Sequence, residues 1–590
     1  MTQLTSTTLF LVFATLIVAT ESRATVFLED NVTGGDCTLF GTWNTASRTC
    51  TLNSNIADSV QIISANLTLD CDDHRITPAN GDDGVTIPDG SDGVTVTNCE
   101  VIQIGPFAAG ILVFSNDSHM ISNTVSAEWC AIDLIFGNDN EVSENTLIGV
   151  INPSFCPNFG CAPDEPFAFG MFSSDSGGHT IANNYIRDVD SGYFSFNGTG
   201  RHIFSENDIE ASRFTIRMDD EEGDDIVIDS NTLTASRAIA VQGNGPFPGG
   251  PYTGSDFGKI TNNEITLDTA GVGFGYGIFI NTGINDWEIS GNRIAGDGIG
   301  DGIVFDVGVE RLLVSENVIK NTLHGISDGS GISAPSKDAI IRDNDIINSE
   351  RPIYLLGDSG HIVEYNRISE SGSVVLMDLT DSVFRNNDIK RGIEIGDKPG
   401  LPSFDGCATG NGCFLQMVVD CNLDAGVLVS GSRDIWLEGN RIDGSFGEGI
   451  RVEPLVREEL KANRRNVDRC FGPPFERPPG TGKFDRLASE NVTLISNIVT
   501  MNGRDGLKLL SADTTKVTQN DFYLNGGFPV FSDEAIELSD DDKGNWWQGN
   551  CSAGLFVAGI HSNDANVVDS HPYNGAIARN PNLNFPLVCP

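Results

Sequence analysis

The sequence is poor in the residues that several common kinds of functional site require. It has 36 Lys and Arg against 82 Asp and Glu, a formal net charge of −46. Such a chain lacks the basic footprint that binding to nucleic acid phosphates requires. It contains no phosphate-binding glycine loop and no nucleophile elbow. We therefore expect no nucleic acid partner, and the acidity favours a protein that works in salt, where charge repulsion is screened.

Long apolar runs are confined to the N-terminus. The segment from Leu9 to Ala19 is almost wholly apolar, and Ser22-Arg23-Ala24 offers small residues at the two positions that a signal peptidase checks. Residues 1–24 are therefore predicted to be a signal peptide. No other apolar stretch reaches the length of a membrane span. We expect a protein without a membrane span that is secreted, periplasmic or at the cell surface, and a monomer.

Cysteine is present at 13 positions, but no Cys-x-x-Cys pair occurs and no cluster of His accompanies the cysteines. This pattern favours disulfides in an oxidising compartment over a zinc site. The spacing suggests the pairs Cys37–Cys50, Cys71–Cys99, Cys156–Cys161, Cys407–Cys413, Cys421–Cys470 and Cys551–Cys589. Cys130 is then left over.

An Asn-x-aliphatic triplet recurs through most of the chain, with neighbouring copies mostly about 21 to 29 residues apart. The Asn positions are 123, 145, 184, 207, 231, 263, 292, 317, 344, 366, 387, 440 and 497. Self-similarity at a nearly fixed period is typical of a solenoid. Thirteen unrelated β-turns in a sandwich are the alternative, which such even spacing makes improbable.

Each repeat combines a short β-branched run, a polar turn with Asn, an aliphatic residue and then a Gly-Ile step such as Gly325-Ile326. Alternating apolar positions broken by Asn, Asp and Gly predict strands. Three strands fit one period. The pattern therefore predicts a right-handed parallel β-helix of about sixteen coils. We expect the Asn to adopt the left-handed corner conformation and to stack in a hydrogen-bonded ladder.

With Asn-x-Ile followed by Gly-Ile-x-Val, residues 45–545 resemble the parallel β-helix repeat proteins of the pectin-lyase-like superfamily. That group includes polysaccharide lyases, hydrolases, epimerases, adhesins and accessory proteins, so the resemblance implies the fold and leaves the activity open. The Gly-His-Gly with paired aspartates of polygalacturonases is absent. The Asp-Pro-His of mannuronan epimerases and the Trp-x-Asp-His of pectate lyases are also absent.

The repeat pattern also predicts how the chain is organised. We expect an N-terminal cap at 25–60, the β-helix at 61–544 and a C-terminal cap at 545–590. Insertions interrupt the period near 151–168, 243–258, 397–415 and 453–490. The last three follow the Gly-Ile-x-Val strand, so we expect them to leave from one corner, where loops on a rigid scaffold tend to carry function.

In Gly-Ile-x-Val the residue x is expected to point outward, so successive coils form an outward column. The column has aromatic residues at Phe172, Phe194, Phe279 and Tyr354. Aromatic faces on a long sheet suit stacking against sugar rings. An insert that simply covers these side chains is an equally good interpretation.

A first charged cluster on the column consists of Arg217, Asp219 and Asp220, followed by four more acids. Dense carboxylates can hold calcium, which prefers several oxygen ligands. Calcium beside an arginine is the arrangement that the resemblance to polyuronate lyases implies, with the metal on the substrate carboxylate and a basic group at C5. A solvated acidic turn is the simpler alternative.

A second cluster consists of Arg451 and Lys508, flanked by Glu394 and Glu537. Arg451 and Lys508 are expected on neighbouring coils about 5 Å apart. Two cations that close can bind a uronate or sulfate and make the lysine a base. A ladder of opposite charges, with the glutamates neutralising the pair, is the alternative.

Histidines give little guidance. His119, His179, His202 and His361 all lie four or five residues before an Asn, which indicates a preference of the coil surface. We expect a protein that engages an acidic extracellular polysaccharide, as a β-eliminating lyase or C5 epimerase if it is an enzyme. A non-catalytic adhesin or accessory protein is the alternative.

Overall fold

The structure is a computed structural model whose description covers most of the repeat region. The described residues are 25–79, 81–150, 168–219, 222–243, 254–269, 275–306, 308–328, 336–357, 359–390, 425–456, 486–513, 515–525, 528–532, 536–538, 545–547, 556–558 and 567–569. The chain divides into two compact units, Met1–Met171 and Phe172–Pro590, which we describe separately. No helix in the described ranges has the length and apolar character needed to cross a bilayer.

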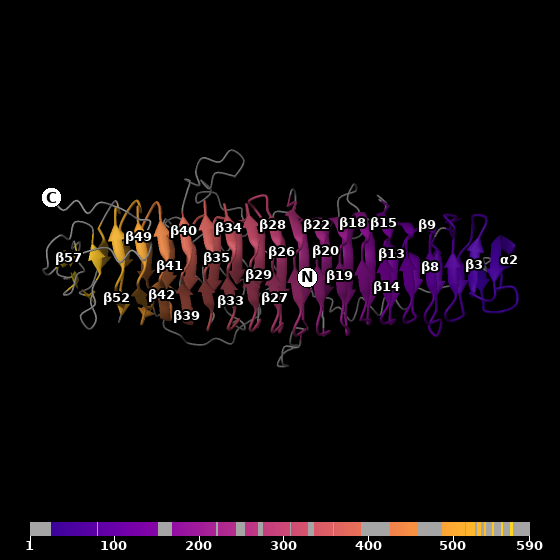
Figure 1. Cartoon of the computed structure of the whole chain (residues 1–590), viewed down its shortest axis with the longest axis horizontal. Coiled ribbons are helices and arrows are strands. Elements are labelled where there is room, and N and C mark those ends of the chain that lie inside the picture. Colours follow the sequence, from indigo (N-terminus) through magenta and orange to yellow (C-terminus); the bar gives the residue numbers. More distant parts are fainter. Residues whose placement is uncertain are drawn as a thin grey trace, which may run out of the picture. The chain divides into compact units, whose positions relative to one another are not determined.

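The first unit is built from short strands that pair in parallel with the equivalent strands of the next coil (Figure 1). One stack consists of β7 (Val85–Ile87), β10 (Ala109–Val113) and β13 (Cys130–Ile135). A second consists of β8 (Thr95–Thr97), β11 (His119–Ile121) and β14 (Glu141–Ser143). A third consists of β9 (Glu100–Gln103), β12 (Thr124–Ala127) and β15 (Thr146–Gly149). Each coil therefore contributes three strands, as predicted.

The N-terminal segment combines a β-helix strand with a local hairpin. Strand β1 (Val26–Leu28) pairs in parallel with β4 (Val60–Ile62). Between them, β2 (Gly41–Asn44) and β3 (Thr49–Leu52) form an antiparallel pair next to the short helix α2 (Cys37–Phe40). The disulfide Cys37–Cys50 joins the helix to the hairpin, as predicted.

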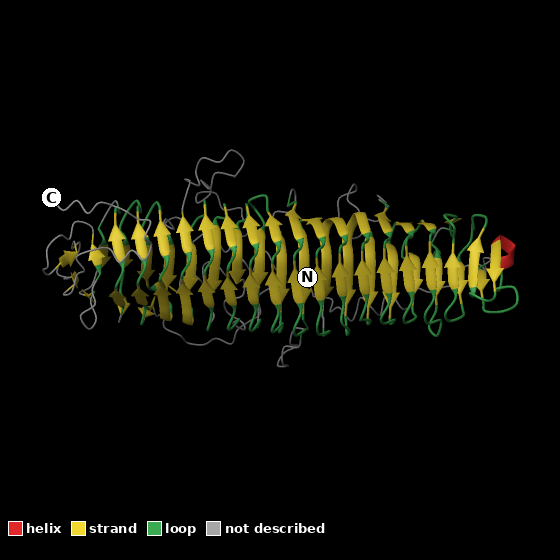
Figure 2. Cartoon of the chain, viewed as in Figure 1, coloured by secondary structure: helices red, strands yellow, loops and turns green. Residues whose placement is uncertain are grey.

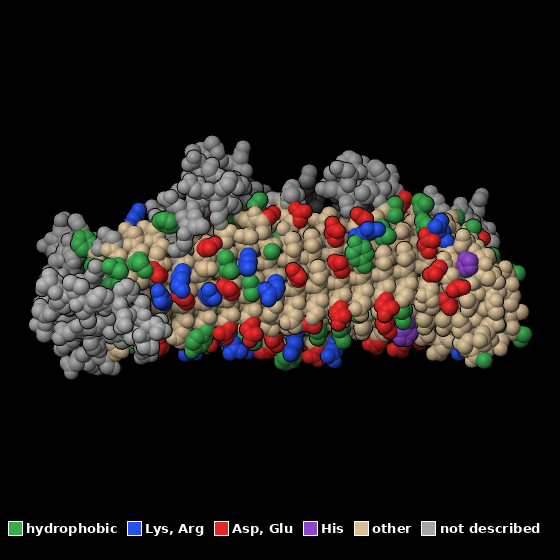
Figure 3. All heavy atoms as spheres, turned by 45° about the horizontal axis from the view of Figure 1, so that its top comes forward, with side chains coloured by type: hydrophobic (Ala, Val, Ile, Leu, Met, Phe, Trp, Pro, Cys, Tyr) green, Lys and Arg blue, Asp and Glu red, His purple; other side chains and the backbone are tan. Residues whose placement is uncertain are grey.

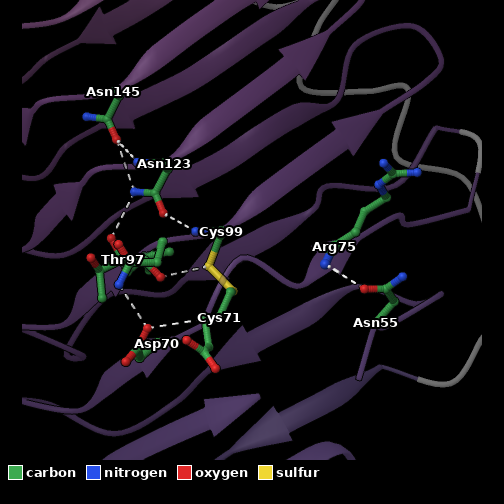
Figure 4. The surroundings of a disulfide bond; sticks show 11 residues. Asn55, Asp70, Cys71, Arg75, Thr97, Cys99, Asn123 and Asn145 are labelled. Atoms are coloured by element: carbon green, nitrogen blue, oxygen red, sulfur yellow. Dashed lines mark hydrogen bonds between the residues drawn. A yellow bond between two sulfur atoms is a disulfide. The ribbon is translucent and has the colours of Figure 1, made fainter. Parts of the chain in front are cut away.

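A second disulfide, Cys71–Cys99, links two successive coils of the first unit, again as predicted (Figure 4). The two Cα atoms are 4.7 Å apart, the spacing of neighbouring strands. Cys130 takes part in neither disulfide, and its thiol donates to the carbonyl oxygen of Ile132 at 3.1 Å. The other cysteines lie outside the described residues. Two buried disulfides are typical of proteins in an oxidising compartment.

The second unit repeats the same three-strand coil (Figure 2). The strands of the Gly-Ile-x-Val segment include β20 (Asp208–Asp219), β23 (Arg237–Gln242), β26 (Tyr276–Asn281), β29 (Asp301–Phe305), β32 (His324–Asp328), β35 (Arg351–Leu356), β38 (Val374–Met377), β41 (Val427–Ser430), β44 (Ile450–Glu453), β50 (Leu507–Leu509) and β54 (Val530–Ser532). These strands pair in parallel from coil to coil. The predicted parallel architecture is thus confirmed here too.

The predicted Asn ladder is present and buried. Asn317 Nδ2 donates to Asn344 Oδ1 at 3.0 Å and to the Ile289 carbonyl oxygen at 2.9 Å. Asn317 Oδ1 accepts from the backbone N–H and from Nδ2 of Asn292. Every hydrogen-bonding atom of the amide is therefore satisfied. In the second unit the same pattern runs from Asn184 to Asn545, and in the first unit it joins Asn123 to Asn145.

The ladder Asn residues do not themselves adopt the left-handed conformation, contrary to expectation. The residue immediately before the Asn does: φ is +58° at Glu316, +56° at Asp343 and +57° at Tyr365. Turning the chain one residue earlier lets the Asn side chain point into the core, where it bonds to its neighbours.

The Gly-Ile step has a steric cause. A Cβ at Gly302 would lie 2.4 Å from the Gly325 carbonyl oxygen and 2.7 Å from Cγ2 of Ile319. A Cβ at Gly325 would meet Ile346 in the same way. Both glycine positions therefore face the core next to Ile303 and Ile326, which are fully buried. The residue before each glycine consequently faces outward.

The first unit holds a pair of enclosed carboxyl groups, Asp83 and Asp133. Burial raises the pKa of Asp133 to about 8, and the nearby charge of Asp83 adds to the shift. Burial also raises the pKa of Asp83, against the hydrogen bond that its Oδ1 accepts from the Ala109 N–H at 2.8 Å. Asp133 Oδ1 is enclosed and accepts no hydrogen bond from the described residues, although the residue as a whole is only partly buried.

Several predicted boundaries meet the limits of the described residues. The predicted signal peptide and the insert near 397–415 lie outside them, as do most of the inserts near 151–168, 243–258 and 453–490. The parallel stack continues beyond 544, because β56 (Trp546–Trp547) pairs with β53 (Asp521–Tyr523). Residues 391–424, which contain the insert near 397–415 and the Gly-Ile-x-Val segment predicted to precede it, lie outside the described residues, so this prediction stays untested.

The ladder predicts that removing the side-chain amide of one Asn lowers the free energy of unfolding substantially. Asn317→Ala removes four hydrogen bonds and leaves buried donors on Asn292 without an acceptor. We expect the free energy of unfolding to fall by about 2–4 kcal/mol, since a buried unsatisfied polar group costs about 1–3 kcal/mol. Denaturant unfolding followed by circular dichroism measures it. Asn53→Ala, at an exposed Asn, is the control, and an equal effect of both changes would contradict the structural role.

The raised pKa of Asp133 predicts that the stability of the folded protein depends on pH. Its folded pKa of about 8 exceeds the unfolded value of about 3.9. The folded state therefore binds the extra proton between these values, and this group lowers stability as the pH rises from about 4 to about 8. Asp133→Asn should raise Tm by several degrees at pH 8 and change it little at pH 4. Exposed Asp89→Asn is the control. A Tm gain independent of pH would refute the assignment.

Candidate functional site

The outward column of the second unit follows directly from the strand register. Neighbouring positions are Phe194, Arg217, Ala240, Phe279, Val304, Ser327, Tyr354, Val375, Leu428, Arg451, Lys508 and Phe531. Phe172 packs its ring against Phe194, with centroids 5.6 Å apart. The column therefore contains all four predicted aromatics and the three predicted basic residues.

Three column positions differ from the prediction. Tyr354 pairs with Val375, so Leu376 lies in the adjacent register position and is buried. Val375 pairs with Leu428, which pairs with Arg451, so this stretch of the column has no place for Glu394, which lies outside the described residues. Phe531 follows Lys508, whereas Glu537 belongs to β55 (Ile536–Glu537) in a separate three-stranded sheet.

The predicted aromatics are half-buried and not fully exposed. Phe279 packs against a buried group consisting of Phe214, Ala240, Tyr276 and Val304. Tyr354 packs against a second group consisting of Leu356, Val375, Met377 and Leu428. Both groups lie on the outer surface of the sheet, so these aromatics combine a packed edge with a partly accessible face.

Arg217 and Asp219 form a bidentate ion pair. Arg217 Nε donates to Asp219 Oδ1 at 3.1 Å, and Nη2 donates to Oδ2 at 2.5 Å. Both carboxylate oxygens of Asp219 are thereby engaged, and Asp220 lies outside the described residues. Within the described ranges no three His, Cys, Asp or Glu side chains are placed to share a metal ion. Calcium binding at Asp219 and Asp220 therefore stays a prediction.

Arg451 and Lys508 lie on neighbouring coils, as predicted, but each has a carboxylate partner. Arg451 Nη2 is 2.7 Å from Glu453 Oε2, and Lys508 Nζ is 3.1 Å from Glu448 Oε1. Burial opposes ionisation of Glu448, yet a backbone hydrogen bond and the Lys508 ammonium hold its pKa below the usual value. The neutralising glutamates are thus Glu448 and Glu453, and the cluster resembles the charge ladder that was the alternative interpretation.

A second outward row is more informative than the first. It consists of the residues that precede the Gly-Ile step or its equivalent, and we call it the pre-glycine row. On six successive coils the row carries Phe214, Arg237, Tyr276, Asp301, His324 and Arg351. Five of these six side chains are polar or titratable, although the row lies beside the apolar groups of the outward column.

Asp301 and His324 form a hydrogen-bonded dyad in this row. His324 Nδ1 lies 2.7 Å from Asp301 Oδ1, and the same oxygen accepts the His324 backbone N–H at 3.2 Å. The His324 side chain is 16% exposed and the Asp301 side chain is 7% exposed, so the contact is shielded from solvent. Because a carboxylate only accepts, Nδ1 carries the hydrogen and the lone pair is on Nε2. Nε2 makes no hydrogen bond with the described residues.

Tyr354 and Arg351 complete the surroundings of the imidazole. The Tyr354 ring centroid is 5.4 Å from that of His324. The Arg351 guanidinium lies over the same Tyr354 ring at 5.3 Å. A base with a fixed tautomer, a guanidinium and a partly exposed aromatic ring therefore meet within two coils.

Tyr276 and Arg237 extend the site in the other direction along the row. Burial raises the pKa of Tyr276 to about 12, with Arg237 opposing the shift. Burial lowers the pKa of Arg237, and the like charges of Arg213 and Arg217 add to this effect. Tyr276 therefore stays protonated at neutral pH, and Arg237 sits in a poorly solvated, positively charged environment.

Sequence reasoning passed over the pre-glycine row. The signal was visible in Asp301-Gly302-Ile303 and His324-Gly325-Ile326, two residues of complementary chemistry at the same repeat position. Three of the histidines that precede the ladder Asn, His179, His202 and His361, are buried in the core and not on the coil surface, contrary to expectation.

Charges of both signs are mixed on the surface of the molecule. On the face drawn in Figure 3, basic side chains stand among acidic ones. Local gatherings of basic groups, such as Arg217 with Arg237, are therefore exceptions in a chain with a net charge of −46.

Comparisons with known proteins concern the fold. No curated protein matches the chain significantly. Among solved structures, a periplasmic alginate epimerase mutant is 11% identical, with 76% of this chain and 79% of that chain covered and a TM-score of 0.32. The catalytic domain of a GH87 α-1,3-glucanase with nigerose is 14% identical. The match covers 58% of this chain and 60% of that chain, with a TM-score of 0.29. A tailspike protein of E. coli bacteriophage HK620 with a pentasaccharide is 12% identical. The match covers 70% of this chain and 66% of that chain, with a TM-score of 0.32.

These likenesses are too distant to carry an activity to this chain. The family model of the right handed beta helix region matches residues 276–450, which include Asp301, His324 and Arg351. Together with the parallel pairing of the strands, this match shows that the chain forms a right-handed parallel β-helix.

Proposed function

We propose that this protein acts on an acidic polysaccharide and removes the C5 proton of a uronate residue, with His324 as the base. The outcome that we favour is β-elimination, which cleaves the chain. The observation that carries the proposal is the Asp301–His324 dyad, with Nδ1 held at 2.7 Å and Nε2 without a hydrogen bond to the described residues, beside Arg351 and Tyr354.

The dyad supplies the two properties that a general base needs. Asp301 fixes the tautomer and the ring orientation and leaves the lone pair on Nε2. This atom is buried and without a hydrogen bond to the described residues, so neighbouring side chains must shift for a substrate to reach it. Its negative charge also stabilises the imidazolium that forms when the proton is taken. The dyad is largely shielded from solvent, so water competes less for the same interactions.

Removal of a C5 proton requires that the neighbouring carboxylate be neutralised, because the developing negative charge spreads onto it. Arg351 pairs with His324 on the next coil, and its guanidinium lies over the Tyr354 ring at 5.3 Å. Guanidinium groups pair with carboxylates in two-pronged geometry. Tyr354 offers a partly exposed aromatic face for the sugar ring. We therefore assign Tyr354 to substrate binding.

The reaction balances without any further reactant. Nε2 takes the C5 proton, the C5–H electron pair forms the C4–C5 double bond, and the bond from C4 to the leaving oxygen breaks. The imidazolium holds the proton that this oxygen needs. Return of a proton to C5 from the opposite face would instead give the epimer, so lyase and epimerase share the first step.

Other predicted residues take supporting positions in this proposal. Phe194 and Phe279 flank Arg217 and Ala240 along the outward column, where an extended sugar chain would run. Arg451 and Lys508, each with a carboxylate partner, are assigned no catalytic role. A binding platform without catalysis remains as an outcome of the test.

The experiment is an ultraviolet assay for unsaturated uronates on purified protein, with polygalacturonate, alginate and glucuronan. A parallel proton–deuterium exchange measurement at C5 detects epimerisation without cleavage. Addition and chelation of calcium in the same assay test the expected metal site at Asp219 and Asp220. Binding of the polymers with neither cleavage nor exchange would leave only the binding platform.

His324→Gln is expected to abolish turnover. Loss of a general base costs about 10²- to 10⁴-fold in rate, and the glutamine amide keeps a similar volume. The kcat should fall by this factor, with KM changed little. His119→Gln is the matched control, since His119 is half-exposed and pairs with Glu141 on the outer surface of the first unit. Full activity of His324→Gln would overturn the proposed function.

Asp301→Asn tests the positioning of the base. The amide lacks the negative charge and can donate to Nδ1, which favours the tautomer with the proton on Nε2. We expect kcat to fall by about 10²-fold or more while polymer binding persists. A fall in binding with unchanged kcat would assign Asp301 to the substrate contact. Asp345→Asn, on another row of the second unit, is the control.

A further inference from the structure

Three arginines converge on one phenylalanine ring in the second unit. The guanidinium carbon lies 4.8 Å from the Phe214 centroid for Arg217 and 5.5 Å for both Arg213 and Arg237. Arg217 also lies 5.0 Å from the ring of Phe194. We call Arg213, Arg217 and Arg237 the arginine platform. Phe214 is only 4% exposed, because these side chains and its apolar neighbours surround it.

The positive charge of the platform is only partly compensated. Asp219 pairs with Arg217, and the charge of Asp190 acts on Arg237. Arg213 is exposed, and Arg237 Nε is buried without a hydrogen-bond partner among the described residues. Three like charges at one ring repel each other, and burial of a guanidinium adds to the cost. An anion bound there would relieve both.

The position of the platform relates it to His324. Arg237, Tyr276, Asp301 and His324 occupy successive coils of the pre-glycine row. Three strand spacings of about 4.8 Å separate Arg237 from His324, about 14 Å in total. Each pyranose of an extended 1→4-linked chain advances by about one strand spacing, so successive sugars of a chain along the row lie beside successive coils.

We propose that the arginine platform is a remote subsite that binds the carboxylate of a uronate about three residues away from the one at His324. This inference rests on the proposed function and goes beyond it, because it assigns charge and length selectivity to residues that do not touch the reacting sugar. Guanidinium forks recognise carboxylates, and Phe194 beside the platform offers a surface for the sugar ring. Remote contacts of this kind add binding energy only for substrates long enough to reach them.

The test measures binding in the His324→Gln background, where turnover does not interfere. Galacturonate and alginate disaccharides, tetrasaccharides and hexasaccharides are titrated by calorimetry, with methyl-esterified galacturonate oligomers as uncharged probes. We expect the affinity to rise by about tenfold or more between the disaccharide and the longer acidic oligomers, and to rise little for the ester. Higher salt should reduce this gain.

Arg213→Ala and Arg237→Gln are then expected to remove the gain for the long oligomers and to leave disaccharide binding unchanged. Arg293→Ala, at an exposed arginine of the same unit, is the matched control. Arg213 is exposed, so its variant should fold even if Arg237→Gln does not. The same length dependence in wild type and platform variants would overturn the inference, as would the absence of any binding.

The two proposals fail in different ways. If His324→Gln keeps its activity but the platform variants lose the length-dependent affinity, the proposed function falls and the anion subsite remains. If His324→Gln is inactive but the platform variants bind like the control, the subsite is refuted and the catalytic assignment is untouched.

Discussion

The buried ladder of asparagine amides is the interaction on which the rest of the structure depends. Each amide donates to the next Asn and to a carbonyl oxygen, and accepts two hydrogen bonds from the Asn before it. An unsatisfied amide in the core is costly, so every coil must meet its neighbour in one register. A slip of one residue would break the ladder and turn each strand's apolar face outward. The ladder therefore fixes which side chains stack on the outer surface.

A fixed register turns repeat positions into rows of neighbours. Asp301 and His324 lie on successive coils, yet the repeat brings Nδ1 within 2.7 Å of the carboxylate. Rigid strands hold this geometry better than a loop would, which suits a general base. The glycine after each of these residues faces the core, and this is why the polar side chain before it can face outward. The same requirement that packs the core thus creates the row that carries the chemistry.

In this acidic chain, several basic side chains are paired with a neighbouring carboxylate. Arg451 and Lys508 are each matched with a glutamate, and Arg217 with Asp219, so the predicted basic pairs are largely neutral. Positive charge and aromatic rings gather at Arg351, beside the dyad, and at the arginine platform, three coils away along the pre-glycine row. Clustered guanidinium groups in an acidic protein attract acidic ligands over a short range, since salt screens the remaining field.

The sequence by itself determined the coil, because its period, its Asn and its Gly-Ile step are local requirements of strands, corners and close packing. It also determined that Arg451 and Lys508 are neighbours, since their offset from the repeat is the same. It did not determine that Val375 is followed by Leu428, or Lys508 by Phe531, in the column, because segments of irregular length hide where the next coil resumes. Nor did it determine the partner of each charge or the dyad of Asp301 and His324. Those depend on how side chains of adjacent coils lean toward each other, which only the packed tertiary structure decides.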